Sequence, residues 1–219
     1  MTGLRDAKRA AVARSLARIA FGLVRDRGLG GVTVEEIVAE AEVSRRTFSN
    51  YYPSKEAAVA AVVVHQVEAA LAAWAPPESA DMDVLDIARL LVDHQLRTGT
   101  LAILTEVAAL SAEHPQLVPY VRDAQWKVWS AVGDRILTAI PAPDSSDAET
   151  VQLVVGGLFG IVSAGLNSTG IRDSDAAPRL HESVHRGLAR LEQGLGRPRC
   201  NNCGHPHMKN AALHRVDGS

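Results

Sequence analysis

The chain is poor in cysteine, in aromatic side chains and in net charge. Its 219 residues include two cysteines, Cys200 and Cys203, with 4% aromatic residues and a formal net charge of −2. Two cysteines so close together exclude a disulfide framework and favour a reducing compartment. The 47% of hydrophobic residues can nevertheless bury a core, which excludes wholesale disorder. The length fits one compact domain or two small ones.

The sequence also lacks an apolar leader segment, a glycine-rich phosphate loop and a nucleophile elbow. Charged residues are spread through the first eighteen positions, from Arg5 to Arg18, so we expect a cytoplasmic protein. The longest uncharged run, residues 150–171, has the length of a membrane span, but it contains glycines and polar residues and no Lys/Arg cluster orients it. We therefore predict a buried helix over residues 150–171. Because the phosphate loop and the nucleophile elbow are both missing, we predict neither enzymatic activity nor a cofactor.

The small net charge hides an uneven distribution. Residues 1–56 carry ten Lys and Arg against seven Asp and Glu, a balance of +3, whereas residues 57–173 carry six against fourteen, a balance of −8. A basic head on an acidic body is expected when only one part of a protein meets an anionic partner.

Helical periodicity runs through nearly the whole chain, and no run alternates as a β-strand does. Val12, Leu16, Ile19, Ala20, Leu23 and Val24 form one apolar stripe of the first helix, and residues 54–74 are apolar on almost every face. Pro76 and Pro77 then form the clearest internal boundary. The fold class is all-α, with further helices predicted over residues 82–97, 100–113, 115–140, 147–168 and 175–195.

Residues 33–55 carry the most informative motif. Thr33 and Glu36 form a capping-box pattern that opens a short helix, and Ser44 can cap a second short helix. Residues 41–43 make the tight turn between them, which gives helix-turn-helix spacing. The second helix presents hydrogen-bond donors and no carboxylate, as contacts to phosphates and base edges require. These outward residues are Arg45, Arg46, Thr47, Ser49, Asn50 and Tyr51.

This segment resembles the DNA-binding domain of TetR-family transcriptional regulators. Two departures from the family pattern occur: Glu42 stands where a turn glycine is usual, and Ser49 stands where an aromatic residue is common. The matching positions are Val43-Ser44, Thr47-Phe48, Tyr51-Tyr52 and Ser54-Lys55-Glu56.

The resemblance implies a division of labour among these residues. Thr47, Tyr51 and Lys55 would hold phosphates, and the neighbouring Arg45, Arg46, Ser49 and Asn50 would face bases. It also implies three parts: a three-helix DNA-binding domain (residues 1–55), a larger helical ligand-binding and dimerisation domain (56–196) and a flexible tail (197–219). The complete predicted DNA-binding set is Thr33, Ser44, Arg45, Arg46, Thr47, Ser49, Asn50, Tyr51 and Lys55.

The resemblance further implies a repressor that binds palindromic double-stranded DNA as a homodimer and is released by a small apolar effector. The segment around residues 112–117 makes an acyl-CoA-like molecule one candidate. Predicted dimer contacts are Gly156, Gly160, Ala164, Val184 and Leu188, although the small residues among them could equally serve packing within one subunit. Predicted effector contacts, each with a role in the core as the alternative, are Leu90, His94, Leu104, Trp126, Trp129, Phe159 and Asn167.

Two metal-like patterns give alternative functions. His181, Glu182 and His185 spell the H-E-x-x-H signature of zinc hydrolases, but Leu188 and Leu191 stand where the extended signature needs a glycine and a third ligand. We therefore expect these residues on the flank of the last helix. The tail residues Cys200, Cys203, His205 and His207 could serve a metal- or redox-sensing regulator, or belong to an unstructured reduced tail.

Overall fold

The computed structural model describes residues 3–76, 82–140, 143–168 and 176–193, and these form α-helices and two short 3-10 helices with no strand. The all-α prediction is confirmed. In chain order the elements are α1 (Leu4–Arg27), η1 (Leu29–Gly31), α2 (Val34–Glu40), α3 (Arg45–Ser49), α4 (Lys55–Ala73), α5 (Val84–Arg97), α6 (Thr100–Glu113), η2 (Pro115–Leu117), α7 (Val118–Leu137), α8 (Ser145–Ser168) and α9 (Ala176–Glu192).

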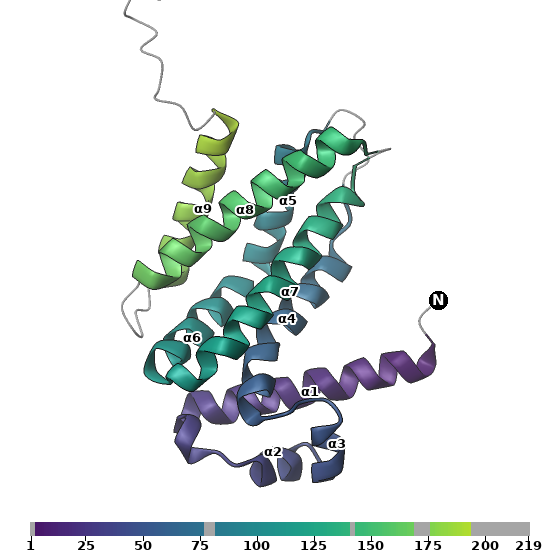
Figure 1. The fold of residues 1–219 in the computed structure, drawn as a ribbon, viewed down its shortest axis with the longest axis vertical. Coiled ribbons are helices and arrows are strands. Elements are labelled where there is room, and N and C mark those ends of the chain that lie inside the picture. The colour runs from purple at the N-terminus through teal and green to yellow at the C-terminus, as the bar shows by residue number, and fades with distance from the viewer. Residues whose placement is uncertain (1–2, 77–81, 141–142, 169–175, 194–219) are drawn as a thin grey trace, which may run out of the picture.

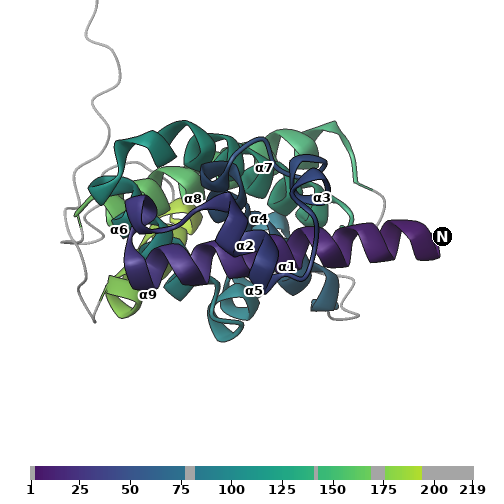
Figure 2. The ribbon, with the colours of Figure 1, turned by 90° about the horizontal axis from the view of Figure 1, so that it is seen from below.

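Helices α1 to α3 lie at one end of the molecule, and α4 leads from them into the body formed by α5 to α9 (Figure 1). Seen from below, α1 runs across the end of the body behind α2, and its N-terminal turns project beyond the other helices (Figure 2). The predicted stripe of α1 is confirmed, because Leu16, Ile19, Ala20 and Val24 are all buried. This stripe packs α1 against α4.

Helix α4 is the central element, as its apolar character on nearly every face predicts. It contacts α1 on one side and α5, α6 and α7 in the body. Val59, Val63 and Val67 are buried along its length. Helix α4 is therefore the element that packs both on α1 and on the helices of the body.

Helix α7 begins later than predicted. The chain forms the separate 3-10 turn η2 at Pro115–Leu117, and α7 starts only at Val118, with Pro119 in its first turn. Proline lacks an N–H and fits the first turn of a helix, where no intrahelical acceptor is available for one. The predicted helix over residues 100–113 matches α6 at both ends.

Helix α8 differs from the buried helix that was predicted. Val151, Val154, Leu158 and Val162 are buried, but another face of the helix reaches solvent, where Leu153 is 75% exposed. By length and composition, α4 and residues 145–166 of α8 are each long and apolar enough to cross a membrane. In this fold α4 is a core helix, and α8 packs on α5, α7 and α9.

Candidate nucleic-acid interface

Side-chain caps fix the two short helices of the predicted motif. Thr33 and Glu36 form the predicted capping box at the start of α2: the Thr33 hydroxyl accepts from the Glu36 N–H (3.3 Å), and the Glu36 carboxylate accepts from the Thr33 N–H (2.8 Å). Ser44 caps α3, accepting from the Thr47 N–H at 3.0 Å. Helices this short are marginal on their own, so these caps and the packing on α1 define them.

The turn between α2 and α3 contains a non-glycine residue with positive φ. Glu42 has φ +52°, and its N–H donates to the Ala39 carbonyl, while the Val43 N–H donates to Val38. This pair of bonds is a Schellman motif, in which the left-handed position is usually occupied by glycine. The turn that the sequence predicts therefore forms, with Glu42 in the conformation that glycine would adopt more easily.

Helix α3 has a buried side and an outward side. Phe48 is 2% exposed and lies 6.0 Å from the Tyr52 ring, which anchors the helix to the core. The Tyr52 hydroxyl donates to the Ala13 carbonyl of α1 at 2.9 Å, and burial, with the nearby Glu68, raises the pKa of Tyr52 to about 12. These contacts hold α3 at a fixed orientation on α1.

The outward side of α3 carries the predicted base readers. Arg46, Ser49 and Asn50 are exposed, and Arg46 has no ion-pair partner among the described residues. Arg45 is also exposed, but its guanidinium pairs with the Glu35 carboxylate of α2 at 2.5 Å. A DNA phosphate or base would have to share or replace that partner.

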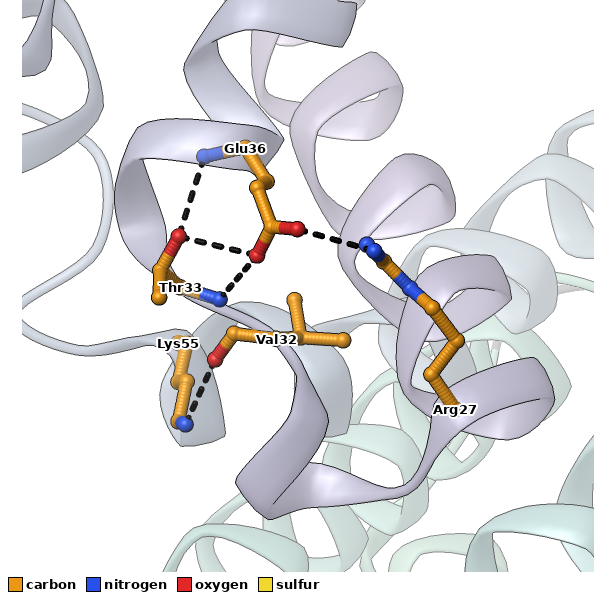
Figure 3. Close-up of polar contacts among 5 residues, drawn as sticks. All are labelled: Arg27, Val32, Thr33, Glu36 and Lys55. Carbon is orange, nitrogen blue, oxygen red and sulfur yellow. Dashed lines mark hydrogen bonds and ion pairs between the residues drawn. The ribbon is translucent and has the colours of Figure 1, made fainter.

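Lys55 is placed differently from the other predicted contacts. Its ammonium donates to the Leu29 carbonyl at 2.6 Å and the Val32 carbonyl at 2.7 Å, so it ties the segment after α1 to the first residue of α4. Figure 3 shows the bond to Val32. Two of its three N–H donors are thereby used inside the protein, and its contact with phosphate stays a prediction.

An ion pair next to Lys55 links α1 to α2. Arg27 donates to the Glu36 carboxylate at 2.8 Å (Figure 3). Hydrogen bonds from the Thr33 backbone and hydroxyl, together with Arg27, hold the pKa of Glu36 below its usual range. The Thr33 hydroxyl donates to Glu36 at 2.9 Å, so this predicted DNA contact is already engaged in the cap.

The structure adds a basic segment that lies outside the helix-turn-helix motif and was not among the predicted DNA contacts. Arg5, Lys8 and Arg9 are exposed on the projecting turns of α1, and the Arg9 guanidinium lies 5.8 Å from the centre of the Tyr51 ring. This brings the end of the helix-turn-helix next to the N-terminal turns of α1. The excess of positive charge over residues 1–56 predicted a basic region, but it did not indicate which cationic side chains lie on the same side of the domain as α3.

A cavity of about 90 Å³ lies within the helical body, between α4, α5, α6, α7, α8 and α9. Leu104 and Trp129 line it as predicted. Trp126 is 77% exposed and does not, which corrects that prediction. The sequence could have excluded Trp126 from the lining, because the apolar stripe of α7 passes through Val121, Trp129 and Val132 and not through Trp126.

Leu90, His94 and Phe159, which were also predicted as effector contacts, lie outside this lining. Leu90 packs partly buried against the core, and the His94 ring nitrogen Nε2 is 2.9 Å from the Ala70 carbonyl. Phe159 is 40% exposed and packs edge-on against Trp129, with ring centres 5.5 Å apart. The side chain of Asn167 lies outside the described residues. Motif reasoning also missed cavity residues on α4 and α5, notably Val63, Val67, Leu91 and Gln95.

The predicted dimer residues separate into two groups. Gly156, Gly160 and Ala164 share the exposed face of α8, and no atom of the described residues lies within 4 Å of a Cβ built on either glycine. Val184 and Leu188 are each 2% exposed inside the protein, so the structure corrects their assignment to an interface. Both residues lie on the apolar stripe of α9 that packs inside the subunit, which is why they are buried and not available to an interface.

The H-E-x-x-H residues take part in other contacts. His185 lies 3.2 Å from the Asp93 carboxylate, and Glu182 pairs with Arg186. No group of three His, Cys, Asp or Glu side chains that could hold a metal ion occurs among the described residues. His181 and Glu182 are exposed on α9, as expected for the flank of that helix. The cysteine- and histidine-containing tail lies outside the described part of the chain.

The family comparison matches the helix-turn-helix region. Residues 18–62 match the model of the bacterial regulatory proteins of the tetR family. Among solved structures, a TetR transcriptional regulator from Rhodococcus sp. RHA1 is 27% identical, with 84% of this chain and 99% of that chain covered and a TM-score of 0.51. GusR from Salmonella enterica is 18% identical, with 82% and 96% covered and a TM-score of 0.41. No curated protein matches the chain.

The described helices therefore form a helix-turn-helix DNA-binding domain joined to a helical body. The matched segment spans α2 and α3 together with the parts of α1 and α4 that hold them. The Rhodococcus similarity extends over the body as well. The N-terminal segment thus carries the DNA-binding motif of the tetR family, and the chain as a whole has a fold similar to that of a TetR transcriptional regulator.

Proposed function

We propose that this protein is a cytoplasmic repressor that binds a palindromic DNA operator as a homodimer and is released by a small apolar effector. One observation carries the DNA-binding part: α3 is anchored by buried Phe48 and turns exposed Arg46, Ser49 and Asn50 outward. These side chains can donate to phosphates or pair with base edges in the major groove. The basic turns of α1 beside Tyr51 extend the same positive surface.

The exposed face of α8 supports assembly as a dimer. Leu153 and Phe159 expose apolar surface there, and Gly156 and Gly160 leave room for a second helix to approach closely. A single five-residue recognition helix reads few bases, so a specific site needs two such helices set one helical turn of DNA apart, about 34–36 Å. The dimer would supply that spacing.

The cavity supports control by an effector. Its walls include Val63 and Val67 of α4, the helix that also packs on α1. A ligand that binds more tightly to a state with α4 displaced would move the two DNA-binding domains out of register. A tenfold loss of DNA affinity requires about 1.4 kcal/mol of differential binding between the two states.

DNA selected from a random library by the purified protein tests this function. Arg46→Ala and Asn50→Ala are expected to relax the preference for particular bases, each costing about 1–3 kcal/mol in binding free energy. Arg122→Ala, an exposed arginine of the body, is the matched control and leaves affinity unchanged. Fluorescence anisotropy with the selected and scrambled duplexes provides the measurement.

Two results would contradict the proposal. One is a wild-type protein that selects no sequence and binds all duplexes equally. The other is full base preference retained in both α3 variants, which would move the reading surface away from that helix.

A further inference from the structure

The projecting turns of α1 carry a basic face, formed by Arg5, Lys8 and Arg9. These residues are spaced at i, i+3 and i+4, so their side chains lie on one side of the helix, and all three are exposed. Among the described residues none of them forms an ion pair, whereas Arg25 and Arg27 at the other end of α1 each pair with a carboxylate. The three cations of the basic face are therefore available to an anionic partner.

The rest of α1 sets the direction of this face. With about 3.6 residues per turn, Arg5 and Arg9 fall on the same side of the helix as Val12 and Leu16. Leu16 is buried and Val12 packs partly buried against the core. Asp6, the one carboxylate on the projecting turns, lies about a quarter of a turn to the side of Arg5. The basic face thus continues, beyond the core, the side by which α1 packs on the rest of the domain.

Tyr51 relates the basic face to the recognition helix. The Arg9 guanidinium lies 5.8 Å from the centre of the Tyr51 ring, within the range of a cation–π contact. Tyr51 follows closely on the end of α3 at Ser49 and is one of the predicted phosphate contacts. In both views the N-terminal turns of α1 extend beyond α3 (Figures 1 and 2). DNA held against the outward side of α3 would therefore pass next to the basic face.

The length of the basic face suits a row of phosphates. From Val12 to Arg5 the helix advances about 10 Å, at about 1.5 Å per residue. The phosphates of one DNA strand follow one another at about 3.4 Å along the duplex axis. The projecting turns therefore span about three phosphates. Contacts of this kind add affinity and position the protein, but they carry no base preference.

We propose that Arg5, Lys8 and Arg9 form a second DNA contact, which binds the phosphates adjoining the bases that α3 reads. The inference rests on the proposed DNA-binding function and adds a binding site outside the helix-turn-helix. It assigns to α1 a part of the affinity that does not depend on sequence, and it leaves the selection of bases to α3.

Two double variants of the full-length protein give a matched test on one helix. Arg5→Ala/Arg9→Ala removes two arginines from the basic face. Arg14→Ala/Arg18→Ala removes two arginines that lie about half a turn away, on the opposite side of α1. All four positions are exposed and alanine is the strongest helix former, so circular dichroism should show unchanged helical content for both variants.

Fluorescence anisotropy at several salt concentrations measures binding to the selected operator and to a scrambled duplex. We expect Arg5→Ala/Arg9→Ala to bind both duplexes about tenfold more weakly at low salt, with the ratio of the two affinities unchanged. Each phosphate contact contributes about 0.9 to the slope of log affinity against log salt, so the slope should fall by about two for each bound chain. Arg14→Ala/Arg18→Ala should keep the affinity and the slope of the wild type.

Ethylation interference locates the contact on the DNA. Ethylation of the phosphates adjoining the bases that α3 reads should weaken binding of the wild type and of Arg14→Ala/Arg18→Ala. The same modifications should have no effect on Arg5→Ala/Arg9→Ala, because the side chains that meet those phosphates are absent.

The outcomes separate this inference from the proposed function. Equal salt slopes for the two double variants would overturn the second contact, as would a loss of base preference in Arg5→Ala/Arg9→Ala, and the operator preference of the wild type would stand in both cases. A wild type that prefers no sequence, while Arg5→Ala/Arg9→Ala alone loses affinity, would support the basic face and overturn the proposed regulator.

Discussion

Glu42 has a backbone conformation that is unfavourable for any residue with a side chain. At φ +52° it occupies the left-handed position of a Schellman motif, where a Cβ is unfavourable and glycine is normally found. The family pattern has a glycine at this turn, and the chain retains the turn without it. The chain therefore adopts this conformation, with the two hydrogen bonds of the turn formed, against the local preference of a residue that has a Cβ.

Glu42→Gly is expected to stabilise the protein by about 0.5–1 kcal/mol, because relief of the left-handed strain exceeds the greater backbone entropy of glycine in the unfolded chain. Urea denaturation of both proteins measures the difference. Glu42→Gln removes the same charge and keeps the strain, so its stability should equal that of the wild type. A glycine variant no more stable than the glutamine variant would show that the turn is unstrained.

At the scale of elements, patterns within the sequence predicted much of the fold. The capping box at Thr33 and the Ser44 cap define α2 and α3 because both depend on side chains within three residues of the helix start. The apolar stripe of α1 and the all-round apolar character of α4 also predicted their burial correctly. These are local or periodic signals, which a sequence expresses directly.

Contacts between distant elements were less accessible from sequence. The acceptors of Lys55 lie more than twenty positions earlier, on carbonyls that any residue type could supply, so no motif identifies them. The exposed face of α8 was not predictable for a similar reason, since a long uncharged run indicates a buried helix without indicating which of its faces the rest of the subunit covers. The lining of the cavity depends on how six helices meet, and no sequence motif marks Gln95 as one of its residues.

Lys55 gives a prediction at this scale, because it joins the segment after α1 to the start of α4. Lys55→Met keeps the aliphatic stem but leaves the carbonyls of Leu29 and Val32, both buried residues, without their donor. We expect a loss of about 1–3 kcal/mol in the free energy of unfolding. Arg46→Met also removes one positive charge but breaks no contact, so its stability should stay within about 0.5 kcal/mol of the wild type.

Urea denaturation of the two methionine variants gives the comparison. If Lys55→Met is as stable as Arg46→Met, the bonds of Lys55 contribute nothing to the fold. The residue would then be available to phosphates, as the family resemblance implies.

At the scale of the whole molecule, the proposed dimer places the exposed face of α8 at the interface between subunits. Gly160→Leu places a large side chain where the subunit itself leaves open space, so the subunit should remain folded while the approach of a second helix is blocked. We expect at least a tenfold weaker dimer in sedimentation equilibrium, with unchanged helical content by circular dichroism. Ser130→Leu adds the same side chain at an exposed position of α7 and should leave the dimer intact. An unaltered dimer in Gly160→Leu would exclude this face as the interface.

The spacing between the two halves of the selected operator tests the central proposal most directly. A rigid dimer that presents two copies of α3 requires the half-sites about one helical turn apart, so inserting five base pairs turns one half-site to the opposite side of the duplex. Affinity for the operator with the insertion is expected to fall to that of a single half-site, and two chains are expected to bind each uninterrupted operator. Equal affinity for both duplexes, with one chain bound to each, would contradict it.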